Sequence, residues 1–389
     1  MPDNTGSLLD FCSTDWQREV IGIYLEGESL SEIARKFNKT PSTISQLVTS
    51  VKNRAAKKGY SPEHDMIHAV PDGFLAKGVS TYYNREGKPV GQWVKSSLDR
   101  ERQLEMIHEM IESMKEEIPR QIPIPAPESS LSDLLNCYII TDYHLGMYSW
   151  GEETGADWDI NIAENLLLSW FRTAIESSPS TEHCVLAELG DFLHTDGIEA
   201  VTPTSHNILD ADTRFSKIVR VAMRVLRQVI NMLLEKHQHV HAIFAEGNHD
   251  IASSIWLREC MSMLYENEPR ITIDTRPDPY YCYEFGKTSL FFHHGHKSRL
   301  SGVDKAFAAK FRDVFGRTVH SYGHTGHLHH DIKKETSLMV IEQHRTLTAP
   351  DSYASRGGWI SGRDAKVITY HKNYGRVGEI VISPDMVKH

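Results

Sequence analysis

The chain has 389 residues and a formal net charge of −10; 40% of its residues are hydrophobic and 24% are charged. The length predicts two or three domains, and the composition is that of a soluble globular protein with enough apolar surface for a core. A protein with this net negative charge does not attract a polyanion through its overall charge, although a local basic patch could still bind one.

The first sixty residues have the pattern of a helix-turn-helix. Apolar residues at helical spacing over 15–25 end at Gly27. Ser29 or Ser31 can cap the next short helix, and Glu32 is placed for a capping box if Ser29 is the cap. Thr40 then caps a longer helix whose first turn holds Pro41. Helix, short turn and helix is the order of this motif.

The second helix of the motif carries side chains suited to base edges and phosphates. We expect the nucleic-acid contacts from Ser42, Thr43, Ser45, Gln46, Lys52 and Arg54. The alternative is a helical bundle used for protein contacts. Residues 78–97 alternate like a hairpin, which is either a wing with Arg85 and Lys88 at its tip or a plain hairpin.

A boundary follows this N-terminal unit. Residues 98–118 form a charged amphipathic helix, and residues 119–130 contain four prolines, which disfavour both helix and sheet. We therefore predict three parts: a helix-turn-helix domain over 1–96, a charged helix and proline-rich linker over 97–133, and a second domain over 134–389.

The second domain alternates short apolar strands with longer helices, which predicts a layered α/β fold. The expected strands are 136–140, 183–189, 239–246 and 288–293, and the expected helices are 213–236 and 253–267. Residues 333–347 and 366–383 return to strand patterning, and we expect these last strands to form a second sheet.

Polar residues follow the predicted strands, at the edge where α/β sheets place their sites. They are Asp142 and His144; Asp191 and His194; Asn248, His249 and Asp250; His294 and His296; and His324, His327, His329 and His330. Imidazole, carboxylate and amide donors without thiolates suit manganese, iron, zinc or nickel.

In order, these segments read D-x-H, G-D-x-x-[DH], G-N-H-[DE], H-G-H and G-H-x-H, and over 134–330 they resemble the calcineurin-like metallophosphoesterases. The resemblance implies two packed sheets flanked by helices and a site for two divalent ions, with manganese expected. It assigns one ion to Asp142, His144, Asp191 and His329. It assigns the other to the shared Asp191 with Asn248, His294 and His327.

Two metals activate water and neutralise charge on a phosphate ester, and the leaving oxygen then needs a proton. The resemblance makes His249 the general acid. Phosphomonoesterases of the family often orient that histidine with an aspartate, and this chain has His194 there, which resembles the SbcD-type DNA nucleases. His296 is expected either to contact a metal through its backbone or to orient a phosphate, and His324 is either an outer residue or incidental.

Residues 343–366 resemble nuclease-like members of the superfamily, including phage-encoded ones. Arg345, Arg356 and Arg363 are candidates for binding substrate phosphate, with solvent-exposed loop arginines as the alternative.

These features together predict a DNA nuclease in which the N-terminal unit binds nucleic acid and the second domain cleaves it. A homodimer is compatible, since SbcD-type enzymes act as dimers. A phosphomonoesterase or small-nucleotide phosphodiesterase, and a DNA-binding regulator with a vestigial site, remain as alternatives. The five scattered cysteines indicate buried thiols in a reducing compartment, and no signal peptide or membrane span is evident. We therefore expect a cytoplasmic protein.

Overall fold

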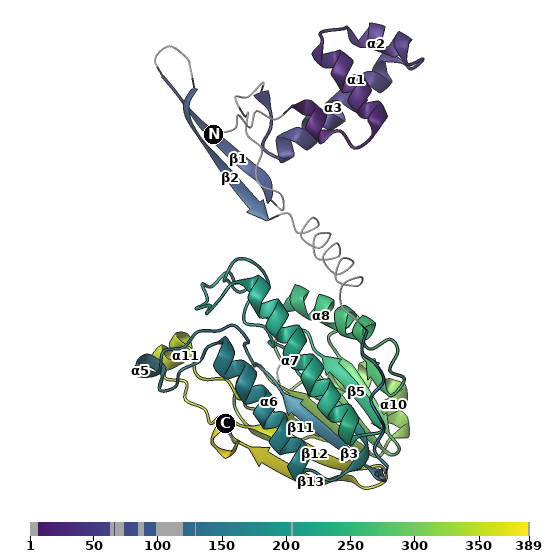
Figure 1. The fold of residues 1–389 in the computed structure, drawn as a ribbon, viewed down its shortest axis with the longest axis vertical. Helices are drawn as coiled ribbons and strands as arrows, with labels where there is room; N and C mark the ends of the chain where they lie inside the picture. Colours follow the sequence, from purple (N-terminus) through teal and green to yellow (C-terminus); the bar gives the residue numbers. More distant parts are fainter. Residues whose placement is uncertain are drawn as a thin grey trace. The chain divides into compact units, whose positions relative to one another are not determined.

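The chain forms two compact units, residues 1–112 and 113–389, in a computed structural model (Figure 1). The structure describes residues 7–62, 66, 74–84, 89–98, 120–128, 130–203, 205–298 and 300–387. Most of the expected charged helix, and the hairpin tip with Arg85 and Lys88, lie outside the described residues. Among the described helices, none is long and apolar enough to cross a membrane.

The first unit is built on three helices whose starts are set by hydroxyl caps. They are α1 (Asp15–Leu25), α2 (Leu30–Lys36) and α3 (Pro41–Lys57), after a short 3-10 turn, η1 (Leu8–Phe11). Ser29 and Glu32 form the capping box of α2, and the Thr40 hydroxyl accepts the Thr43 amide at the start of α3. The helices share a core that includes Val20, Ile21, Ile33, Ala34, Ile44, Leu47, Val48 and Val51.

A hairpin follows the three helices. Strands β1 (Phe74–Tyr83) and β2 (Pro89–Leu98) are antiparallel, and Val79 pairs with Val94. This is the strand pattern that the alternation over 78–97 predicts.

The second unit contains a six-stranded sheet in the order β13-β12-β3-β4-β5-β6. Its strands are β3 (Leu131–Ile140), β4 (Thr181–Glu188), β5 (His239–Phe244), β6 (Ile271–Ile273), β12 (Ala365–His371) and β13 (Gly375–Ile382). β3 to β6 are parallel, whereas β12 is antiparallel to both β3 and β13.

A five-stranded sheet in the order β10-β11-β9-β8-β7 lies against the first. Its strands are β7 (Tyr281–Phe285), β8 (Thr288–Phe292), β9 (His320–Thr325), β10 (Ile332–Glu335) and β11 (Val340–Gln343). The two sheets enclose one apolar core, in which Ile139, Val185 and Ile243 from the first sheet meet Leu290 and Phe292 from the second.

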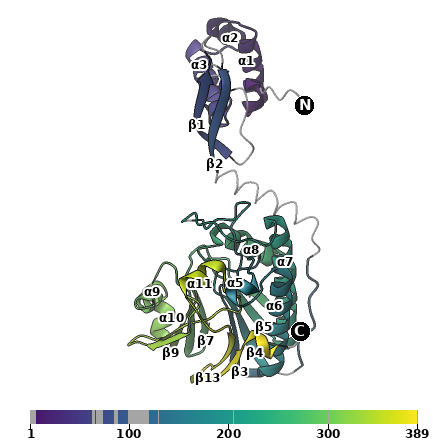
Figure 2. The same cartoon turned by 90° about the vertical axis from the view of Figure 1, so that its left-hand side faces the viewer.

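Helices cover both outer faces, as Figure 2 shows. They are α5 (Gly151–Thr154), α6 (Ile160–Ser177), α7 (Phe215–Lys236), α8 (Ile251–Leu264), α9 (Val303–Lys310), α10 (Arg312–Arg317) and α11 (Ser352–Gly357). α7 buries Ile218, Val225 and Leu233 along one face, and α9 packs Phe307 against Phe291 of the second sheet. The predicted arrangement of two packed sheets flanked by helices is confirmed.

Two details differ from the expectations. The last strands do not form a sheet of their own, because β12 and β13 extend the first sheet while β10 and β11 extend the second. β12 is buried on both faces, so its pairing with β3 completes the core. Helix α6 was not among the expected helices, although Ala163, Leu167 and Trp170 recur at helical spacing on its buried face.

The proline-rich segment is extended and bonded to the second unit. The Gln121 amide donates to the Leu264 carbonyl, and the Gln238 side chain donates to the Pro127 carbonyl at 2.6 Å. This part of the expected linker therefore runs along the surface of the unit that it precedes.

Candidate metal centre

Five loops form the candidate site, and each follows the carboxyl end of a strand. β3, β4 and β5 are parallel neighbours in one sheet, and β8 and β9 are parallel neighbours in the other. Backbone hydrogen bonds join the loops: the Asp142 amide donates to the Gly190 carbonyl at 3.0 Å, and the Gly326 amide donates to the His294 carbonyl at 2.8 Å. Side chains far apart in the sequence thereby meet at one edge.

One group of donors consists of Asp142, His144 and His329. Their ligand atoms all lie within 4.8 Å of one another. His329 Nε2 is 3.2 Å from Asp142 Oδ1, and the His144 amide donates to the Asp191 carbonyl at 3.0 Å. Two imidazoles and a carboxylate thus face a common point, where an ion would bind.

A second group consists of Asp142, Asp191, His294 and His327, again with ligand atoms within 4.8 Å of one another. His294 Nε2 lies 3.2 Å from Asp191 Oδ2 and 3.2 Å from Asn248 Oδ1. The structure therefore brings all the predicted ligands of both ions into one site.

Asp142 is shared between the two groups, whereas the resemblance assigns the shared position to Asp191. Asp142 Oδ2 accepts the His327 amide at 2.8 Å and the Thr141 hydroxyl at 2.5 Å. Its Oδ1 atom is buried and faces His329 Nε2 at 3.2 Å and His294 Nε2 at 3.8 Å. A buried carboxylate is costly to desolvate, and a cation bound among these atoms would offset that cost.

The electrostatics of the side chains also fit a cation site. Burial alone would lower the pKa of His294, but the carboxylates of Asp191 and Asp142 outweigh burial and raise this pKa to about 10. Without metal, the imidazole therefore holds a proton where it would otherwise ligate an ion. The described donors at this centre are nitrogen and oxygen atoms, which suit manganese, iron, zinc or nickel.

The backbone is strained at the same residues. Of the seven described non-glycine residues with positive φ, five are predicted metal ligands. They are Asp142 (50°), His144 (47°), Asp191 (55°), His327 (74°) and His329 (56°). Each such conformation costs about 1–3 kcal/mol and persists only where the surroundings enforce it, which is typical of functional sites.

Glycines next to the ligands allow the loops to approach closely. A Cβ atom on Gly247 would overlap the Asp191 carboxylate, and one on Gly326 would overlap the Thr141 hydroxyl. Gly190 has a φ of 100°, and a Cβ there would lie 2.9 Å from the Gly247 amide nitrogen. These contacts explain why glycine precedes the ligand in the G-D, G-N-H and G-H-x-H segments.

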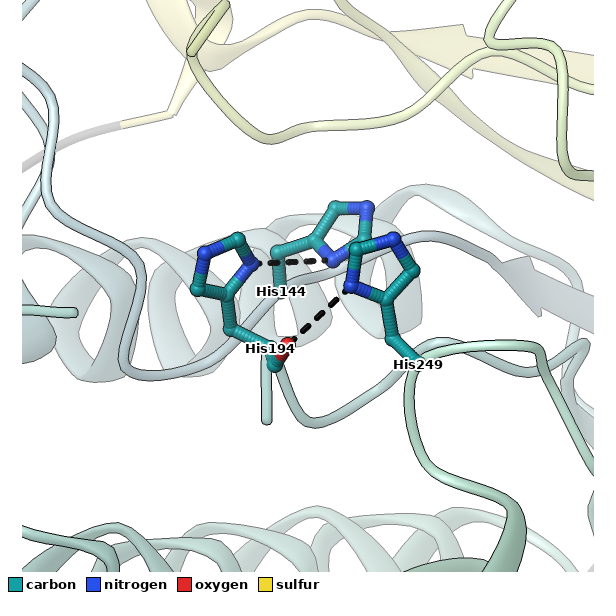
Figure 3. A group of neighbouring side chains, drawn as sticks. All are labelled: His144, His194 and His249. Atoms are coloured by element: carbon teal, nitrogen blue, oxygen red, sulfur yellow. Dashed lines mark hydrogen bonds between the residues drawn. The ribbon is translucent and has the colours of Figure 1, made fainter. Parts of the chain in front are cut away.

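Three imidazoles, those of His144, His194 and His249, gather in Figure 3, and His144 also belongs to the first donor group. His249 Nδ1 donates to the carbonyl oxygen of His194 at 3.1 Å, which leaves His249 Nε2 as the nitrogen available to a substrate. The rings of His249 and His144 are 4.7 Å apart between centroids. His249 therefore lies beside a predicted metal ligand with its tautomer set by a backbone carbonyl.

The ring of His194 lies beside those of both His144 and His249, with centroids 5.3 and 5.6 Å away. The Nδ1 atoms of His194 and His144 are 3.5 Å apart. Burial, reinforced by His249, lowers the pKa of His194 to about 3, so this ring is neutral. His194 thus orients His249 through its carbonyl oxygen, a contribution that its side-chain type could not indicate.

Several residues that position the ligands were not identified from the sequence. The Asp250 carboxylate accepts the amides of Asp191, Leu193 and Gly247 at 3.1–3.2 Å, which joins the loops after β4 and β5. The hydroxyls of Thr346 and Thr348 both donate to the Asp142 carbonyl, at 2.7 and 3.0 Å. Asp250 is the last residue of the G-N-H-D segment, which the sequence did single out. The threonines lie in residues 343–366, where no role was assigned to them.

The residues expected to bind substrate phosphate fall into two classes. His296 has 10% of its side chain exposed, and its ring is 5.3 Å from that of His294. Both of its ring nitrogens are buried without a hydrogen-bond partner among the described residues. Arg345 pairs with Asp364 at 2.8 Å, and Arg363 donates twice to the Leu347 carbonyl. The nitrogens of His296 therefore lack partners beside the donor groups, while these contacts of the two arginines hold residues 344–364 in place.

The four histidines of residues 323–330 have different surroundings in the structure. His324 is buried, and its ring nitrogens bond to His344 at 3.0 Å and to the Tyr370 hydroxyl at 2.9 Å. His330 is exposed. His327 and His329 are the members of this segment that join the donor groups, which agrees with the alignment of "GHLH" to the motif.

In the first unit, the exposed side of α3 lines a groove of about 540 Å³. Its lining residues are Ser45, Gln46, Thr49, Ser50, Asn53, Arg54 and Lys57. Ser42 is exposed at the start of the same helix.

The remaining predicted nucleic-acid contacts are engaged within the first unit. Arg54 donates to the Phe11 carbonyl at 2.8 Å, Lys52 lies over the Tyr24 ring, and the Thr43 hydroxyl bonds to that of Thr40. Thr49, Asn53 and Lys57 were not among the predicted contacts, although they recur on this side at helical spacing.

No known family profile matches the chain, and no curated protein matches it. Among solved structures, an archaeal phosphodiesterase is 13% identical with a TM-score of 0.34, and 64% of this chain aligns with 99% of it. A Streptococcus pneumoniae protein described as a predicted phosphoesterase is 11% identical with a TM-score of 0.28, over 64% of this chain and 98% of that one. A putative 5'-nucleotidase from Staphylococcus aureus is 10% identical with a TM-score of 0.32, over 66% and 55%.

Proposed function

We propose that the chain is a metal-dependent phosphodiesterase of the calcineurin-like metallophosphoesterase type, and that its substrate is DNA. The observation that carries this proposal is the pair of donor groups that share Asp142. Two divalent ions held there would lower the pKa of a water molecule and neutralise negative charge on the phosphoryl oxygens.

The chain's own residues supply the rest of the chemistry. As an imidazolium, His249 would donate its Nδ1 proton to the His194 carbonyl and its Nε2 proton to the leaving oxygen. The two buried ring nitrogens of His296 have no hydrogen-bond partner among the described residues, and its one N–H would donate to a phosphate oxygen that takes that place. His249 follows β5 of the first sheet, and His296 follows β8 of the second. A phosphate bound by both would therefore lie between the edges of the two sheets.

Two features support a nucleic acid as the substrate. The exposed side of α3 carries short polar side chains and Lys57 along a groove, which suits a helix that contacts base edges and phosphates. The second feature is His194, which stands where the monoesterases of the family often have an aspartate. We therefore propose that the first unit binds DNA and presents it to the metal centre.

The proposal predicts a specific pattern of hydrolysis. With manganese, the protein should hydrolyse bis-p-nitrophenyl phosphate faster than p-nitrophenyl phosphate, and it should degrade end-labelled DNA. Removal of metal with a chelator should abolish both activities, and added manganese should restore them. Preferential monoester hydrolysis with no action on DNA would instead favour a phosphomonoesterase, and no hydrolysis of either would favour a DNA-binding regulator.

A second prediction concerns the α3 groove. Replacing the exposed Lys57 by alanine should weaken DNA binding several-fold at about 0.1 M salt, and should reduce the slope of log affinity against log salt by about 1. Arg18→Ala, which removes an equal charge from the exposed surface of α1, is the matched control and should leave the slope unchanged. Fluorescence anisotropy with a labelled duplex measures both. Equal slopes for the two variants would contradict a DNA-binding role for this groove.

A further inference from the structure

Residues 344–364 form a strap whose two ends are bonded to predicted metal ligands. Near its start, the Thr346 and Thr348 hydroxyls donate to the Asp142 carbonyl. Near its end, the Ser361 hydroxyl donates to the His329 carbonyl at 2.5 Å. Both ligands belong to the same donor group, so the strap begins and ends at the metal centre.

The middle of the strap is fixed as well. α11 lies beside α5 in Figure 1, and the Ser355 hydroxyl donates to the Glu153 carbonyl at 2.9 Å. The Ser149 hydroxyl donates to the Pro350 carbonyl at 2.7 Å, and Ser352 donates to Asp210. The strap is therefore held to the loops after β3 and β4, which also carry ligands.

This fixed segment exposes aromatic rings to solvent. Tyr353 is 69% exposed and Trp359 is 52% exposed, and their rings make an edge contact at 5.0 Å. Tyr148 and Trp150, on the neighbouring loop, are also exposed. We call these four residues the aromatic rim. Large exposed apolar groups held in place by a hydrogen-bonded frame are typical of a binding surface.

One residue of the rim, Trp359, lies close to the metal centre. Trp359 is two residues from Ser361, and two residues of extended chain span at most about 7 Å between Cα atoms. Because Ser361 is bonded to the carbonyl of His329, Trp359 is held near a residue that would ligate an ion. Tyr353 is in ring contact with Trp359, so a strand whose phosphate is at the metal centre has both rings within reach.

We propose that the aromatic rim stacks unpaired nucleobases of a DNA strand whose phosphodiester is held at the metal centre. This inference rests on the proposed function and adds the substrate class: single-stranded DNA or a frayed end. Aromatic side chains stack on any base, because every base has a π-face. In an intact duplex the bases stack on one another, so these faces are unavailable to the rim.

The test compares two short substrates that share a backbone. One is an eight-unit oligothymidylate, and the other is the same chain with every base removed. The wild-type protein should cleave the base-bearing chain with a KM about tenfold lower than that of the abasic chain. Trp359→Ala should remove most of this preference through KM and not kcat, and Trp359→Phe should retain it. Contacts of the first unit with the phosphate backbone are common to both substrates, so the comparison removes their contribution.

Tyr374→Ala is the matched control. Tyr374 is also exposed, but it lies in the turn after β12, at the opposite end of that strand from the strap. Its replacement should leave the preference unchanged. If Trp359→Ala and Tyr353→Ala kept the wild-type preference, the stacking inference would be overturned while the nuclease proposal stood. If the wild-type protein degraded duplex DNA but cleaved neither chain, the inference would fail while the nuclease proposal stood. If it hydrolysed bis-p-nitrophenyl phosphate but cleaved neither chain nor duplex DNA, the nucleic-acid proposal itself would fail, and the inference with it.

Discussion

Asp142→Asn is expected to remove most of the metal binding and to lower turnover by on the order of 10³-fold. Asp142 is the residue shared by both donor groups, and its buried Oδ1 lies 3.2 Å from His329 Nε2. The amide keeps the size of the side chain, and asparagine tolerates the positive φ of 50° better than most residues do. The loss would therefore report the missing negative charge and not a collapse of the loop.

Metal content after dialysis against manganese, measured by mass spectrometry, and hydrolysis of bis-p-nitrophenyl phosphate give the two readouts. Asp304→Asn is the control, because Asp304 is a buried carboxylate on α9 that belongs to no donor group among the described residues. It should keep both metals and full activity. Wild-type metal content in Asp142→Asn would show that the two donor groups do not depend on this carboxylate.

The position of the site could be predicted because its ligands follow apolar strands. Asp142, Asp191 and Asn248 come just after β3, β4 and β5, and the carboxyl ends of parallel strands meet at one edge. The order of the strands in the two sheets could not be predicted in the same way. β12 is as apolar as a strand of either sheet, and only its pairing with β3 assigns it to the first.

The finer arrangement of the site was also beyond the sequence, because it depends on backbone atoms. The carbonyl of His194 sets the tautomer of His249, and any residue type has a carbonyl. The strap is fixed by serine and threonine hydroxyls, which are common in loops and carry no distinctive spacing. Trp359 became informative only when its exposure and its closeness to the His329 carbonyl were known together.

His249→Ala is expected to keep both metals and to lose turnover on DNA by about 10²- to 10⁴-fold. The reason is that a deoxyribose alkoxide is a poor leaving group unless it receives a proton, and the imidazolium form of His249 can supply one from Nε2. Hydrolysis of bis-p-nitrophenyl phosphate should fall much less, because p-nitrophenolate leaves readily without a proton. The ratio of the two losses therefore distinguishes a general acid from a residue that merely supports the fold.

His330→Ala is the matched control for this prediction, since His330 is an exposed histidine adjacent to the ligand His329. It should behave as the wild-type protein does on both substrates. His249 also belongs to a group with His144 and His194 whose nitrogens lie within 4.8 Å of one another, so it has the geometry of a ligand as well. Loss of a bound ion in His249→Ala, with equal losses on the two substrates, would identify it as a ligand and remove it as the general acid. Retained metal with a selective loss on DNA would identify the proton donor, because only a group that acts on the leaving oxygen responds to what that oxygen is attached to.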